Sequence, residues 1–158
     1  MSWGGGTPEL NLETAFTLVN VAVLPGWVAL FGFPRWRWTP TLAGVVIPGL
    51  MALVYVGIVG VGLTRPAQGS PASLMTLAGV KALFADDLTV LGGWVHYLAF
   101  DLVAASWEHR DARRLGIPHA ALVPCLFLTL MLGPLGFLCY LGLRAALRRT
   151  VTLPAEAA

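Results

Sequence analysis

Four long apolar stretches dominate this chain, and they leave it few folds to adopt. Hydrophobic residues make up 57% of its 158 residues and charged residues only 11%, whereas soluble domains are about one-quarter charged. A helix needs about 20 apolar residues to cross a bilayer, and its backbone must be hydrogen-bonded internally. The pattern predicts an all-α, polytopic membrane protein: a single domain over residues 1–158, with four transmembrane helices in a compact bundle at 12–33, 41–63, 88–107 and 118–143.

The connections between these stretches carry their own signals. Residues 34–40 alternate Arg and Trp between two prolines, which is typical of an anchor at the lipid headgroups. The longest connection, 64–87, becomes apolar at helical spacing in its second half, which predicts a short interfacial helix between spans two and three. The charged segment 108–119 contains Gly116 and Pro118, a helix stop and a helix start that make spans three and four antiparallel neighbours.

The fourth stretch contains its own helix breakers. Pro124 and the pair Gly133 and Pro134 predict a kink near mid-membrane, whose freed carbonyl groups need partners inside the bundle. If the chain crosses four times, the basic residues divide equally between the two sides, so the positive-inside rule does not orient the protein. One side has Arg35, Arg37, Arg110, Arg113 and Arg114, and the other has Arg65, Lys81, Arg144, Arg148 and Arg149.

Several classes of protein are disfavoured by the composition. Nine of the ten basic residues are Arg, which indicates a GC-rich bacterial genome and hence the bacterial inner (cytoplasmic) membrane. The basic residues flank the spans, so we expect lipid and not nucleic acid as their partner. Residues 1–10 lack the basic segment of a secretory signal, so we expect the first span to be retained. Cys125 and Cys139 lie about 21 Å apart along one helix and cannot form a disulfide.

The third stretch carries the best candidates for chemistry, His96 and Asp101. An ionisable group inside a membrane span is costly and usually faces a cavity or a partner. Low dielectric favours the neutral form of both groups, which suits a general acid and a general base. At about 100° per residue the two side chains lie about 140° apart, so we expect them not to pair directly but either to line two walls of one pocket or to find separate partners on neighbouring helices. The alternative is that Asp101 only locks the packing of helices, paired with Arg110 or His119.

Other polar and aromatic residues could complete a binding site around these two. Trp94 and Tyr97 share a helical stripe with Asp101 and Glu108. Counting depth along antiparallel spans places Asn20 and Tyr55 in one polar layer with His96, and the kink at Gly133 and Pro134 comes to a similar level. The predicted substrate-binding residues are Asn20, Tyr55, Trp94, Tyr97 and Pro134. The three histidines fit no known ligand spacing, and no nucleotide or haem motif occurs, so we expect no metal and no cofactor.

The segment from Trp94 to Leu102, WVHYLAFDL, is similar to the neoxanthin synthase-like (abscisic-acid-deficiency) membrane protein family, of which this chain resembles a bacterial homologue. The likeness also covers NVAVLPGW at 20–27, PRWRW at 34–38, GIPH at 116–119 and GPLG at 133–136. In plants this family is required to convert violaxanthin to neoxanthin, an isomerisation that opens an epoxide and forms an allene. The resemblance therefore implies a carotenoid or another isoprenoid as partner, with Asp101 as the acid and His96 as the base.

Three functions follow as hypotheses. The first is an isomerase of carotenoids or other isoprenoids, of the epoxide-opening type. The second is a non-catalytic pigment-binding, lipid-binding or assembly protein of the membrane. The third and least favoured is a small transporter, because four spans without an inverted repeat offer little polar lining, although an oligomer would supply more.

Overall fold

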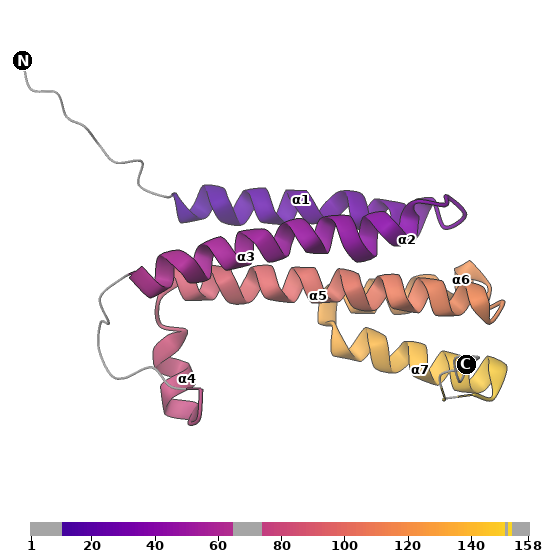
Figure 1. Cartoon of the computed structure of the whole chain (residues 1–158). Coiled ribbons are helices and arrows are strands. Elements are labelled where there is room, and N and C mark those ends of the chain that lie inside the picture. The colour runs from indigo at the N-terminus through magenta and orange to yellow at the C-terminus, as the bar shows by residue number, and fades with distance from the viewer. Residues whose placement is uncertain (1–10, 65–73, 151, 153–158) are drawn as a thin grey trace, which may run out of the picture.

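The computed structural model describes residues 11–64, 74–150 and 152, and every regular element in these residues is helical. α2, the π-helical segment η1 and α3 follow one another without interruption and form one long helix (Figure 1). The elements are α1 (Leu12–Gly32), α2 (Thr39–Thr41), η1 (Leu42–Val46), α3 (Ile47–Thr64), α4 (Leu77–Leu83), α5 (Asp87–Arg114), α6 (His119–Leu132) and α7 (Pro134–Arg148).

Helix α5 is the axis of the molecule, and α1, α3, α6 and α7 all contact it (Figure 1). Its N-cap is Asp86, whose carboxylate accepts a hydrogen bond from the backbone N–H of Thr89 at 2.9 Å. Its 28 residues span about 42 Å. Val95 and Leu102 on this helix are fully buried, so α5 supplies the centre of the apolar core.

Three helical segments are long and apolar enough to cross a membrane: Leu12–Gly32, Thr39–Thr64 and Asp87–Arg114. They approach one another closely where small residues allow it. A Cβ on Gly26 of α1 would lie 2.9 Å from Leu102 Cδ2, and one on Gly44 would collide with Ser106. Large apolar side chains such as Leu53 and Val56 are exposed on the outside, where lipid would cover them. The predicted helix between spans two and three is also present, as α4.

The prediction of one continuous fourth span at 118–143 is corrected by the structure. α6 ends at Leu132, and α7 returns alongside it as the second arm of a helical hairpin (Figure 1). The cause is Gly133, whose φ of 43° and ψ of −96° lie outside the helical region, followed by Pro134 at the start of α7, where a proline is well tolerated. The predicted kink is thus a reversal, and α6, at 14 residues, extends only about 21 Å.

Candidate functional site

Three buried carboxyl groups on α5 face the α6–α7 hairpin, and we call them the acid column: Asp101, Glu108 and Asp111. Their exposed fractions are 8%, 0% and 5%. Residues seven apart on a helix lie on nearly the same stripe, two turns from one another, so Asp101 and Glu108 point the same way, and Asp111 follows one turn later. Each of the three has different surroundings.

Asp101 lies at the tip of the hairpin. A Cβ built on Gly133 would lie 2.8 Å from Asp101 Oδ1 and 3.5 Å from the ring of Tyr97, so the turn is pressed against both side chains. The ring of Tyr97, one turn earlier on α5, lies beside the same turn as the Asp101 carboxyl. Asp101 Oδ2 has no hydrogen-bond partner among the described residues. A buried carboxyl oxygen without a partner is costly. Glu108 Oε2 also has no partner among the described residues, but Asp101 lies at the hairpin turn beside Tyr97, which makes its Oδ2 the better candidate to meet a ligand.

Glu108 lies in the middle of the acid column, against α6. The Thr129 hydroxyl lies 2.9 Å from Glu108 Oε1 and 3.0 Å from the carbonyl oxygen of Cys125. One hydroxyl carries one proton, so it can donate fully to only one of these two oxygens. If it donates to the Cys125 carbonyl, then Glu108 is protonated and itself donates to the Thr129 oxygen.

Asp111 closes the open end of the hairpin. Its Oδ2 accepts a hydrogen bond of 2.6 Å from the Tyr140 hydroxyl and lies 2.9 Å from Nε of Arg144, both on α7. Its Oδ1 accepts a hydrogen bond of 2.6 Å from the guanidinium of Arg114. Arg144 is 1% exposed, so its charge depends on Asp111 for compensation. These contacts hold α7 to α5 and are structural.

Aromatic side chains continue the stripe beyond Asp101 toward the other end of α5. Trp94 stacks on Tyr97, with ring centroids 5.5 Å apart, and lies 5.8 Å from Phe16 of α1. The Trp94 indole N–H donates to Asn20 Oδ1 at 3.2 Å. Of the predicted site residues, Asn20, Trp94, Tyr97 and Asp101 therefore form one connected group, with Pro134 next to the turn residue Gly133.

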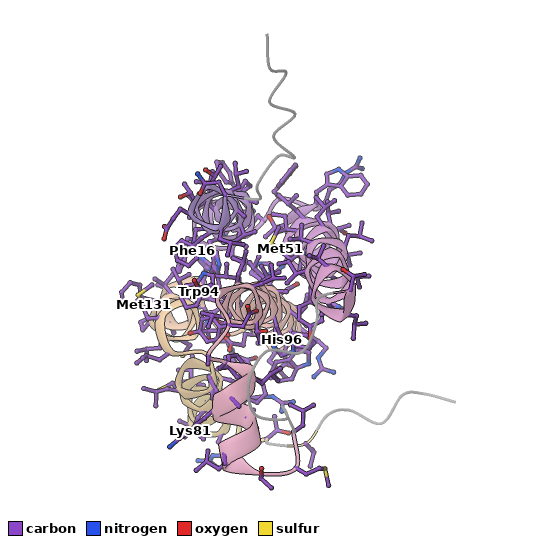
Figure 2. The ribbon with its side chains drawn as sticks, turned by 90° about the vertical axis from the view of Figure 1, so that its left-hand side faces the viewer. Phe16, Met51, Lys81, Trp94, His96 and Met131 are labelled. Atoms are coloured by element: carbon purple, nitrogen blue, oxygen red, sulfur yellow. The ribbon has the colours of Figure 1, made fainter. Side chains whose placement is uncertain are left out.

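His96 and Tyr55 form a separate pair on the other side of α5. Figure 2 shows His96 on the side opposite Trp94. The ring of His96 lies 6.0 Å from that of Tyr55 on α3 and 4.5 Å from Phe100, and all three side chains are exposed. Asn20, Tyr55 and His96 thus lie near one level, as the depth count predicts, but Asn20 meets the Trp94 face of α5 and the other two its opposite face. The catalytic roles of His96 and Asp101 stay predictions.

The other two histidines contact backbone carbonyl groups at the end of α1. His109 Nε2 lies 3.0 Å from the carbonyl oxygen of Pro34, and His119 Nε2 lies 3.1 Å from that of Phe31. The last carbonyl groups of a helix lack intrahelical partners, and His119 supplies a partner for one of them, whereas Pro34 lies in the turn just after α1. His119 is therefore engaged elsewhere than at Asp101. Among residues 11–64, 74–150 and 152, no group of three or more His, Cys, Asp and Glu side chains is placed to hold a metal ion.

Sequence reasoning missed Asp111, Thr129, Tyr140 and Arg144 as partners in one polar cluster. It placed Glu108 on the stripe of Asp101, which was the available signal. It could not bring Tyr140 and Arg144 to Asp111, because a straight fourth span carries them to the opposite end of α5.

Comparison with known proteins places the chain in a family. The family model described as ABA DEFICIENT 4-like matches residues 14–140, which is most of the chain. No curated protein and no solved structure matches. The match covers all of the three candidate spans except the first two residues of α1, together with α6, the turn at Gly133 and part of α7. The chain therefore belongs to the ABA DEFICIENT 4-like family of membrane proteins.

Proposed function

We propose that this protein binds a carotenoid or another isoprenoid in the cytoplasmic membrane of a bacterium and isomerises it, with Asp101 as the acid. The observation that carries the proposal is the Asp101 carboxyl, which is buried at the hairpin tip with one oxygen lacking a described partner. Such an atom suits contact with a polar group at the end of an otherwise apolar ligand.

The surroundings of Asp101 support acid chemistry on a polyene. Epoxide opening needs a protonated group near the epoxide oxygen, and an apolar setting keeps a carboxyl neutral. The neighbouring rings of Tyr97 and Trp94 offer a flat apolar surface for a conjugated chain. The reaction is balanced without a redox partner, because the proton given to the oxygen is matched by one removed from the polyene by a base. His96 is the proposed base.

The position of His96 favours a second candidate, a non-catalytic pigment- or lipid-binding or assembly protein. An acid and a base acting on adjoining carbons must both touch one short stretch of substrate. His96 and Asp101 instead lie on different faces of α5, with His96 beside Tyr55 and Phe100. In this candidate, Asp101 and Tyr97 hold a ligand in place and His96 lies against lipid or a partner.

Expression in a carotenoid-producing host separates the two candidates. Pigments from whole cells and from the purified protein would be identified by chromatography and mass spectrometry, for the native chain, for Asp101→Asn and for His96→Ala. Asp87→Asn is the matched control, since Asp87 is an exposed carboxyl in the first turn of the same helix. The isomerase predicts a new pigment that is lost in Asp101→Asn and kept in the control.

The other outcomes are equally informative. A pigment that co-purifies unchanged with the native chain, and is released in Asp101→Asn, supports the binder. Loss of conversion in Asp101→Asn with full conversion in His96→Ala keeps the isomerase but removes His96 as its base. A pigment profile that neither substitution changes contradicts both candidates at this site.

A further inference from the structure

The hairpin changes which charges lie together. Because α7 runs back along α6, its end lies beside the α5–α6 turn and not across the membrane from it (Figure 1). Two contacts fix this arrangement: Arg148 donates to the carbonyl oxygen of Gly116, and Arg144 pairs with Asp111. The turn after α1 joins the same end, since Arg113 donates to the carbonyl oxygen of Pro34 at 3.2 Å.

One end of the molecule is therefore rich in arginine, and we call it the arginine face. Its exposed members come from three separate parts of the chain: Arg35, Arg37, Arg110, Arg113, Arg114, Arg148 and Arg149. Ion pairs between described residues at this end involve only Arg114 and Arg144, and both use Asp111. The face thus keeps a large positive charge.

The opposite end of the molecule carries the reverse balance. It comprises the start of α1, the end of α3, the helix α4 and the start of α5 (Figure 1). Lys81 is the one basic residue described there, against the carboxyl groups of Glu13, Asp86 and Asp87. Even with Arg65, which follows α3 directly in the sequence, this end has far fewer basic residues than the arginine face.

We propose that the arginine face is the cytoplasmic surface of the protein, where it binds anionic lipid headgroups, and that the hairpin dips into the membrane from that side without crossing it. Basic residues near the ends of spans stay on the side from which the chain is inserted, and that leaflet attracts basic clusters when its lipids are anionic. With four spans, the basic residues divide equally between the two sides of the membrane. Because α7 turns back, its arginines join the other arginines, and the division is no longer equal.

The aromatic residues beside these arginines fit a headgroup surface. Trp36 and Trp38 are about half exposed, and the guanidinium of Arg37 lies over the Trp38 ring, 5.0 Å from its centroid. Tryptophan is enriched at the membrane interface. A shallow hollow nearby is lined by Arg114, Leu115, Arg144, Thr150 and Thr152. Of its two arginines, Arg114 is exposed, whereas Arg144 is buried against Asp111.

This orientation also gives the acid column a direction. Asp111 lies at the open end of the hairpin, on the cytoplasmic side, and Asp101 lies ten residues earlier on α5, about 15 Å deeper. Asp101 is then near the middle of the membrane, because it lies halfway along α5, and the hairpin separates it from the cytoplasmic surface. The orientation itself does not depend on the proposed function.

Cysteine labelling in intact bacterial cells tests the orientation. Cys125→Ala and Cys139→Ala remove the native thiols, and single cysteines are then introduced as Lys81→Cys, Arg37→Cys and Ala146→Cys, all at exposed positions. A membrane-impermeant maleimide is added before or after the cells are permeabilised. We expect Lys81→Cys to react in intact cells, and Arg37→Cys and Ala146→Cys to react only after permeabilisation.

Each position tests one part of the proposal. Labelling of Arg37→Cys in intact cells would overturn the orientation. Labelling of Ala146→Cys together with Lys81→Cys would overturn the hairpin, because α7 would then end on the far side. Accumulation of each variant in the membrane fraction, measured by immunoblot, shows that it has been inserted.

Native mass spectrometry of the purified protein tests the lipid preference. The probes are phosphatidylglycerol and phosphatidylcholine, mixed in equal amounts in detergent. We expect several retained phosphatidylglycerol molecules, and a fall in their excess of roughly fivefold or more when Arg37→Gln and Arg110→Gln are combined. Lys81→Gln is the control and should leave the excess unchanged. Equal retention of the two lipids by the native chain would overturn the headgroup assignment.

Discussion

Asp101 and Asp111 are both aspartates on α5, yet they differ in their hydrogen-bond partners. Asp111 accepts from Tyr140 and Arg114 and lies 2.9 Å from Nε of Arg144, so its charge is compensated and its position fixed. Asp101 is equally buried, but its Oδ2 has no described partner. Burial alone therefore does not distinguish the two aspartates, whereas their hydrogen-bond partners do. Glu108 Oε2 resembles Asp101 Oδ2 in having no partner among the described residues.

Asp111→Asn should destabilise the protein by about 3–5 kcal/mol, because it leaves the buried charge of Arg144 uncompensated. Unfolding of the purified protein in detergent, followed by circular dichroism against denaturant, measures the change. Asp87→Asn, at an exposed carboxyl on the same helix, should cost far less. Equal stability of the two variants would mean that this ion pair does not hold the hairpin.

Glu108 should be protonated, because its partner hydroxyl on Thr129 has a second acceptor in the Cys125 carbonyl oxygen. Glu108→Gln keeps a donor for Thr129 and should change the free energy of unfolding by less than about 1 kcal/mol, whereas Glu108→Leu should lose about 1–3 kcal/mol. Infrared spectroscopy should show the carbonyl band of a protonated carboxyl that Glu108→Gln removes. An unchanged band in that variant would contradict the protonated state.

At the scale of the helices, the apolar pattern predicts which helices form better than it predicts where each helix ends. The first two spans are predicted at 12–33 and 41–63 and found at Leu12–Gly32 and Thr39–Thr64. The third is predicted to end at 107, but α5 continues to Arg114. The additional turns contain charged residues, and a span predicted from hydropathy ends at the first charged residues. They stay helical because Glu108 and Asp111 find partners on the hairpin, which lies far away in the sequence.

A helix-breaking pair in an apolar stretch does not specify the direction in which the chain continues. Gly133 and Pro134 predict that the fourth stretch bends, but a kink and a reversal have the same sequence signal. The reversal depends on tertiary packing: a Cβ on Gly136 would collide with the backbone nitrogen of Thr129, so only glycine lets α7 lie so close to α6. That contact joins two helices, and no count along one helix reveals it.

Gly136→Ala should therefore open the hairpin or strain it, at a cost of about 1–3 kcal/mol. Gly142→Ala is the matched control on the same helix, since a Cβ there has nothing within 4 Å, and it should be neutral or stabilising by up to about 1 kcal/mol. Thermal unfolding in detergent compares the two. A Gly136→Ala protein as stable as the control would contradict the close packing of α6 on α7.

At the scale of the molecule, α5 lies between two sets of packed helices. α1 and α3 pack on it as membrane helices, while the hairpin covers its acidic stripe (Figure 1). The predicted site divides differently: Asn20 of α1 joins Trp94, Tyr97 and Asp101, whereas Tyr55 of α3 and His96 lie on another face of α5. The angle of about 140° between His96 and Asp101 predicts this division, but whether the two walls enclose one pocket depends on how the neighbouring helices are placed.

A hairpin and a fourth span place Arg148 next to different residues, so crosslinking distinguishes the two paths of the chain. In the hairpin, Arg148 donates to the Gly116 carbonyl and so lies near Arg114. In a fourth span, it would lie on the side of Lys81, across a hydrocarbon core of about 30 Å. In a background with Cys125→Ala and Cys139→Ala, a short bifunctional maleimide should join Arg114→Cys to Arg148→Cys within one chain. It should not join Lys81→Cys to Arg148→Cys.

Mass spectrometry of the digested protein identifies the joined peptides. The opposite result, with the second pair joined and the first not, would require α7 to continue through the membrane, and the arginine face would then lose the residues that α7 contributes to it.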